Sequence, residues 1–218
     1  MASWLPLTAR QAEAGPLGTV LILGVTGISG YLAVQNARLL GATRVIGAGR
    51  NPAGLERAAA AGAQTTALTG DRDTDAAAIA EALGTGTSAS GTGAPGLGAP
   101  GLVLDFVWGP VAETAFAALA RSGFGEDTAD IKYVQIGALG GPEAAVPSAL
   151  LRSRKLTISG SGAGSVTAAS IATQIPAYIK LIADGSVQVP FRTFPLSQAG
   201  TAWTASTDSG PRVVLVPD

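Results

Sequence analysis

Residues 19–30 read Thr-Val-Leu-Ile-Leu-Gly-Val-Thr-Gly-Ile-Ser-Gly, an apolar run followed by a glycine-bearing turn. The apolar residues 20–23 predict a buried strand, and the pattern after the turn predicts a helix over residues 28–40. Amides in the first turn of such a helix, together with the positive end of its dipole, bind phosphate groups. The stretch therefore predicts a site for a diphosphate.

Two glycines of this turn have separate expected roles. Gly27 and Gly30 fill the second and third positions of the pattern G-x-G-x-x-G, whereas Val25 fills the first. Gly27 would let the backbone approach the phosphates, and Gly30 would let the helix pack closely on its strand. Because 30 glycines in 218 residues also produce such spacings by chance, the alternative is an ordinary tight turn. A second strand, expected over residues 44–48, favours dinucleotide binding.

The residues after the second strand indicate which dinucleotide. Binders of NAD usually place an acidic residue there for the ribose 2′-hydroxyl. Here Arg50 and Asn51 follow the strand, and the first acid is Glu56. The Arg50 guanidinium suits a 2′-phosphate, and Asn51 could donate to it or cap the helix that Pro52 begins. This predicts NADP(H); the alternatives are a solvated arginine and a simple cap.

The composition excludes several kinds of chemistry. The chain has no cysteine and no histidine, so it has no disulfide, no thiolate nucleophile, no Ser-His pair and no zinc site of the usual kind. We expect no metal. A net charge of −1 gives no support for nucleic-acid binding. No apolar run is long enough to span a membrane, and the N-terminus lacks the features of a signal peptide, so a cytoplasmic location is expected.

Apolar strands alternate with helical segments along the chain, which predicts an α/β fold, a Rossmann-type doubly wound parallel sheet. Strands are expected over residues 20–23, 44–48, 64–68, 102–107, 132–136 and 156–159. Helices are expected over residues 28–40, 52–61, 71–83, 111–122, 148–152 and 167–184, with a kink at Pro176. Residues 84–101 are of low complexity and predict a flexible insert at the N-terminal edge of the sheet, away from the ligand edge.

The turns that follow the strands should meet at the C-terminal edge of the sheet. Asp105 ends the fourth strand and could bond the adjacent turn or a water at the cofactor site; the alternative is a structural carboxylate. Trp108 could form a wall of the nicotinamide or adenine region, and its alternative is simple packing. The glycine-bearing turns 136–138 and 160–162 could let the backbone approach a flat ring, or merely punctuate the chain.

Together these motifs resemble the cofactor-binding half of a medium-chain dehydrogenase/reductase of the zinc-independent, quinone oxidoreductase-like kind. The residues that carry the resemblance are Ser3-Trp4-Leu5, 20–30, 47–52, 102–109, 133–137, Ala202-Trp203 and 210–215. The resemblance implies an NADP-binding Rossmann domain over residues 1–186. It also implies that residues 187–218 are a short β-α-β remnant of a GroES-like catalytic domain, with strands over 188–194 and 212–217 and a helix over 196–206. The N-terminal GroES-like domain itself is missing from this sequence.

The resemblance also assigns cofactor contacts. The phosphate turn falls on Thr26, Gly27, Ile28 and Gly30, and the 2′-phosphate contacts fall on Arg50 and Asn51. The turns on the adenine and nicotinamide sides fall on Phe106, Val107, Trp108, Ile136, Gly137, Ala138, Gly160, Ser161 and Gly162. The family's zinc ligands have no counterparts, as in members that pass hydride directly to an enone or quinone.

The leading hypothesis is an NADPH-dependent oxidoreductase that transfers hydride to a carbonyl, enone or quinone substrate, with Ser161 as a weak candidate proton donor. The alternative is a non-catalytic NADPH-binding module or redox-sensing subunit. A third reading, an S-adenosylmethionine or other nucleotide binder, is disfavoured by Arg50, and the Tyr-x-x-x-Lys pair of short-chain reductases is missing. Exposed strand edges predict a homodimer.

Overall fold

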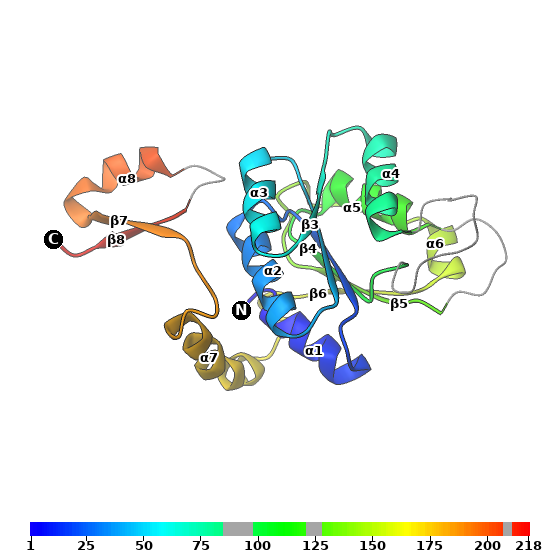
Figure 1. Cartoon of the computed structure of the whole chain (residues 1–218), viewed down its shortest axis with the longest axis horizontal. Helices are drawn as coiled ribbons and strands as arrows, with labels where there is room; N and C mark the ends of the chain where they lie inside the picture. Colours follow the sequence, from blue (N-terminus) through cyan, green and yellow to red (C-terminus); the bar gives the residue numbers. More distant parts are fainter. Residues whose placement is uncertain (85–97, 121–127, 207–210) are drawn as a thin grey trace.

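The computed structural model describes residues 1–84, 98–120, 128–206 and 211–218, and it confirms the predicted fold class. Six parallel strands form one sheet in the order β3-β2-β1-β4-β5-β6 (Figure 1). They are β1 (Thr19–Leu23), β2 (Arg44–Gly49), β3 (Gln64–Ala67), β4 (Leu102–Asp105), β5 (Asp130–Gln135) and β6 (Lys155–Gly160). The order reverses between β1 and β4, which is the point where doubly wound sheets bind their ligands.

The pairing register places the ends of the strands at one level. Leu23, the last residue of β1, pairs with Ala48 of β2 and with Asp105 of β4. Asp105 in turn pairs with Gln135, and Gln135 pairs with Gly160. The turns after β1, β2, β4, β5 and β6 therefore leave the sheet along a common edge, as the sequence predicted.

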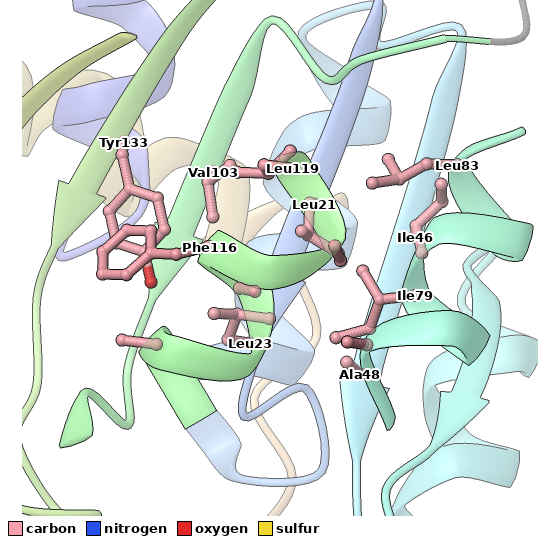
Figure 2. Close-up of a cluster of buried hydrophobic side chains, with 14 of the residues drawn as sticks. Leu21, Leu23, Ile46, Ala48, Ile79, Leu83, Val103, Phe116, Leu119 and Tyr133 are labelled. Atoms are coloured by element: carbon pink, nitrogen blue, oxygen red, sulfur yellow. The ribbon is translucent and has the colours of Figure 1, made fainter. Parts of the chain in front are cut away.

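Helices cover both faces of the sheet. They are α1 (Trp4–Ala14), α2 (Ile28–Leu39), α3 (Pro52–Ala60), α4 (Arg72–Leu83), α5 (Gly109–Leu119) and α6 (Ser148–Ser153). Helix α7 (Ala168–Ala183) follows β6 and packs on α1 and α2. Alternate residues of the central strands point to opposite faces, so Leu21 and Leu23 pack with α4 and α5 (Figure 2), whereas Val20 and Ile22 pack with α1, α2 and α3. Continuous apolar strands are required because both faces are buried.

Helix α1 is an element that the sequence analysis did not predict. Its Trp4 ring lies 5.2 Å from the ring of Tyr178 on α7, and Trp4 Nε1 donates to Gln174 Oε1 at 3.0 Å. Asn36 of α2 donates to Ser3 Oγ at 2.9 Å and to Tyr178 Oη at 3.1 Å. These buried contacts dock α1 and α7 on α2, through residues that lie far apart in the sequence.

Several predicted boundaries were wrong by a few residues. The strand predicted over 102–107 ends at Asp105, because the Asp105 side chain takes up the amides of the next turn. The helix predicted over 111–122 begins earlier, at Gly109, and ends at Leu119, since Ala120 is extended; residue 122 lies outside the described residues. Most of the predicted insert 84–101 also lies outside them. Helix α7 runs continuously past Pro176.

The C-terminal segment has the predicted β-α-β connectivity. Strands β7 (Phe191–Pro195) and β8 (Arg212–Val216) pair in parallel as a separate two-stranded sheet, and a 3-10 turn (Leu196–Gln198) leads into α8 (Ala199–Ala205). The strand predicted over 188–194 begins only at Phe191. Figure 1 shows this unit at the left of the view, apart from the main sheet. None of the helices in the described ranges has the length and apolar character needed to cross a membrane.

Candidate nucleotide-binding edge of the sheet

The turn between β1 and α2 leaves helix amides unpaired. Gly24, with φ of +83°, reverses the chain after β1, and its amide donates to the carbonyl of Ala48 at 2.9 Å. Gly27 is the N-cap residue of α2 and brings no side-chain cap. The amides of Ile28, Ser29 and Gly30 make no hydrogen bond within the described residues. Such amides at a helix N-terminus attract an anion.

The two glycines of the turn differ in what surrounds them. A Cβ on Gly30 would lie 2.3 Å from the Gly24 carbonyl oxygen and 2.6 Å from Val25 Cα, so the helix packs too closely on the turn for any side chain. A Cβ on Gly27 would meet nothing nearer than the Gly24 oxygen at 3.7 Å, which is ordinary contact. The fold thus requires glycine at position 30 but not at position 27, where the space fits an approaching ligand.

Small residues of β2 and α3 accommodate the larger side chains of the turn. Thr26 fits a notch between Gly49 and Gly54: a Cβ on Gly49 would lie 2.5 Å from Thr26 Cγ2, and one on Gly54 would lie 2.5 Å from Thr26 Cβ. The guanidinium of Arg57 donates to the carbonyl of Thr26 at 3.4 Å. This notch, which the sequence analysis did not find, fixes the phosphate turn against the loop that carries Arg50.

Arg50 and Asn51 stand immediately after β2. Arg50 is exposed and makes no hydrogen bond or ion pair to the described part of the chain, so its guanidinium is available to a ligand. Asn51 Oδ1 accepts from the amide of Gly54 at 2.8 Å, which confirms the predicted helix cap. The predicted contact of both residues with a 2′-phosphate remains a prediction.

Asp105 holds the turn between β4 and α5. Its carboxylate is fully buried and accepts from the amides of Val107 at 2.8 Å and Trp108 at 2.9 Å, and from Tyr133 Oη at 2.6 Å. Burial raises the pKa of the Asp105 carboxyl, although these hydrogen bonds oppose the shift. Burial, together with the neighbouring carboxylate, raises the pKa of Tyr133 well above its ordinary value. The bond of Asp105 to its adjacent turn, one of its two expected roles, is confirmed.

Trp108 directs its side chain to the core. Its ring lies 6.2 Å from the rings of both Phe116 and Tyr133 in edge-on arrangements. This is the simple packing that the sequence analysis kept as its alternative. The side chain is only partly buried, and its predicted contact with the cofactor remains a prediction; the backbone of Trp108 has φ of +60°.

The turn after β5 lies directly against the turn after β4. The amides of Ile136 and Gly137 donate to the carbonyl of Asp105 at 2.7 and 3.1 Å. A Cβ on Gly137 would lie 2.4 Å from the carbonyl oxygen of Phe106. On the other side, a Cβ on Gly24 would lie 2.7 Å from Val107 Cγ2. The structure thus brings the predicted residues 24–30, 106–108 and 136–138 together along one edge.

The turn after β6 borders a pocket. The Ser161 amide donates to the carbonyl of Gln135 at 2.8 Å. A Cβ on Gly160 would meet only the Gln135 carbonyl oxygen, at 4.0 Å, and one on Gly162 would meet open space. A pocket of about 190 Å³ between α1, β5 and β6 is lined by Leu5, Pro6, Ala9, Arg10, Glu13, Lys132, Val134, Ser159, Gly160, Ser161, Val166 and Ser170. Of the predicted site residues only Gly160 and Ser161 line it. No cluster of carboxylates able to hold a metal ion occurs among the described residues.

Comparison with known proteins agrees with this arrangement, although no family model matches the chain. The probable NADPH-dependent quinone reductase tdiC of Emericella nidulans is 30% identical over 224 residues, which cover 99% of this chain and 59% of that protein. The quinone oxidoreductase of Pseudomonas syringae pv. tomato DC3000 is 19% identical, with a TM-score of 0.66 over 98% of this chain and 62% of that one. The chain resembles the cofactor-binding half of a medium-chain dehydrogenase/reductase.

Other solved structures share the fold. The alcohol dehydrogenase TADH from Thermus sp. ATN1 has a TM-score of 0.68 at 23% identity and matches 100% of this chain over 57% of its own length. AibC has a TM-score of 0.71 at 22% identity, over 54% of its length. The chain thus spans less than two thirds of each of these relatives, and its resemblance to the medium-chain dehydrogenases/reductases, expected from the sequence, is confirmed.

Proposed function

We propose that this chain binds NADP(H) at the C-terminal edge of its sheet and serves an oxidoreductase that reduces a carbonyl, enone or quinone. The proposal rests on one observation: the N-terminus of α2 has no side-chain cap, and Arg50, after the neighbouring strand, is exposed and makes no bond to the described residues. Amides supply the diphosphate site, and a guanidinium suits a 2′-phosphate. The relative named as an NADPH-dependent quinone reductase supports the choice of cofactor.

Different residues at this edge would bind different parts of the cofactor. The amides of Ile28, Ser29 and Gly30 hold the diphosphate, and Arg50 and Asn51 hold the 2′-phosphate. The turns 106–108, 136–138 and 160–162 border the nicotinamide. When bound, NADPH supplies a hydride, and the reduced carbonyl or quinone oxygen takes one proton from solvent or from a hydroxyl. Ser161 is the candidate hydroxyl, because it lines the pocket beside the last of these turns.

A titration with NADPH and NADH, followed by nicotinamide fluorescence, tests the cofactor. We expect saturable binding of NADPH and weaker binding of NADH. Binding of neither nucleotide would exclude the proposed function. An assay of NADPH oxidation with simple quinones and enones then separates an enzyme from the alternative, a nucleotide-binding module or redox sensor, which would bind NADPH without oxidising it.

A further inference from the structure

Asp105 connects two turns of the proposed cofactor edge. Its carboxylate accepts from the amides of Val107 and Trp108, and its main-chain carbonyl accepts from the amides of Ile136 and Gly137. One buried residue therefore fixes the turn after β4 and the turn after β5 at the same time. Both turns are among those predicted for the adenine and nicotinamide sides of the site, and the proposed function places them beside the nicotinamide.

The turn after β4 is held in an unfavourable backbone conformation. Trp108 has φ of +60° and ψ of −161° and is the one non-glycine residue with positive φ in the described ranges. Such a conformation persists only where neighbouring groups fix it, and it is most common at functional sites. The Trp108 amide is fixed by Asp105, and its ring is wedged against Tyr133 and Phe116.

Tyr133 completes this arrangement from the next strand. Its hydroxyl donates to the second carboxylate oxygen of Asp105 at 2.6 Å, and its ring centroid lies 4.9 Å from that of Phe116. Figure 2 shows the two rings against each other. The side chains of Asp105 and Tyr133 are both fully buried, so neither can touch a ligand. A buried carboxylate needs all of its hydrogen bonds, because its charge is otherwise uncompensated.

We propose that Asp105 and Tyr133 are positioning residues for the nicotinamide half of the cofactor. They act through the backbone of Val107 and Trp108, whose strained conformation they hold, and through the turn at Ile136 and Gly137. The Val107 carbonyl also accepts from the Gly140 amide at 2.7 Å, so the loop after β5 is bonded to the same turn. This inference rests on the proposed function.

Binding of two ligands distinguishes a positioning role of these residues from a general loss of stability in their variants. NADPH reaches both halves of the edge, whereas adenosine 2′,5′-bisphosphate reaches only the phosphate turn and Arg50. Tyr133→Phe removes a hydrogen bond to a charged group, and we expect the misplaced turn to weaken NADPH binding by about tenfold, while the affinity for adenosine 2′,5′-bisphosphate changes less than about twofold. Calorimetry with each ligand gives both values.

Tyr178→Phe is the matched control. It removes another buried tyrosine hydroxyl, the partner of Asn36 at 3.1 Å, in a network between α2 and α7. We expect it to leave the affinity for both ligands unchanged. Equal losses for the two ligands in Tyr133→Phe, or no loss for either, would overturn the proposal. Binding of neither ligand by the unaltered chain would instead exclude the proposed function.

Asp105→Asn gives a second test if Tyr133→Phe does not fold. The amide oxygen of asparagine can still accept from Val107 and Trp108, and its NH₂ group can donate to Tyr133. We expect this conservative variant to bind NADPH within about threefold of the unaltered chain, and Asp105→Ala to lose about tenfold or more. An Asp105→Asn variant as weak as Asp105→Ala would overturn the proposal, because the charge and not the hydrogen bonds would then matter.

Discussion

The side chain of Val25 occupies the space that a Cβ on Gly47 would need: the two atoms nearest each other, that Cβ and Val25 Cγ2, would lie 2.6 Å apart. Val25 stands where the usual phosphate turn has its first glycine, and it is fully buried. The chain tolerates valine there because the neighbouring strand has no side chain opposite it. The valine in the phosphate turn is therefore accommodated by the glycine in β2.

This relationship predicts the behaviour of two substitutions. We expect Gly47→Ala to lower the free energy of unfolding by about 1–3 kcal/mol, because it overpacks the core. Val25→Gly in the same chain should recover part of the loss, and urea denaturation of the four proteins measures the coupling. Gly162→Ala is the control, since open space surrounds that residue and its cost should stay within about 0.5 kcal/mol. Strict additivity of the pair would contradict the packing argument.

Substitutions of Gly27 and Gly30 should have different effects, the first on NADPH affinity and the second on the free energy of unfolding. We expect Gly27→Ala to leave the free energy of unfolding within about 0.5 kcal/mol, because its Cβ has room, yet to weaken NADPH binding by crowding the phosphate. Gly30→Ala should cost about 1–3 kcal/mol of stability, since its Cβ would meet the backbone of the turn. Calorimetry with NADPH and thermal unfolding provide the two readings. An unchanged NADPH affinity in Gly27→Ala would contradict the prediction that this turn binds the phosphate.

Arg50 should decide between the two pyridine nucleotides. We expect Arg50→Asp to weaken NADPH binding by about tenfold to a hundredfold, because a charge-assisted contact with the 2′-phosphate is replaced by repulsion. NADH, which lacks that phosphate, should lose little. Arg152→Asp, at an exposed position on α6, is the control for the general effect of charge. Equal losses for NADPH and NADH would contradict the assignment of Arg50.

The buried carboxyl of Asp105 should make the free energy of unfolding depend on pH. Its pKa is raised in the folded chain, so the folded state holds this proton more tightly than the unfolded state does. Stability from this group is therefore present at low pH and is lost as the pH rises from the ordinary aspartate value through the raised one. Relative to Asp105→Asn, the unaltered chain should gain stability as the pH falls from 7 to 4. A difference that does not change with pH would contradict the raised pKa.

Unpaired strand edges predict self-association. Strand β6 pairs only with β5 within the described residues, and β7 and β8 pair only with each other, with Leu215 and Val216 exposed. Such edges offer main-chain groups to another strand. We expect sedimentation at micromolar concentration to show a dimer or larger species, and Leu215→Glu to reduce it if β8 takes part. A monomer at every concentration tested would exclude self-association.

The sequence was sufficient to predict the elements that depend on local pattern. The strand before Gly24, the glycine turn, the helix after it and the alternation of strands and helices are set by neighbouring residues: apolar runs, glycines and capping side chains. The Asn51 cap was predicted for the same reason, because its partner Gly54 lies three residues away. The common edge of the turns followed from the parallel sheet.

The tertiary structure alone decided how distant residues meet. The bond between Tyr133 and Asp105 joins positions 28 apart, and the bond between Trp4 and Gln174 joins positions 170 apart. The fit of Val25 to Gly47 depends on two strands lying in a fixed register. Composition and periodicity do not predict such pairs, because the packing of the strands and helices determines which distant side chains come into contact.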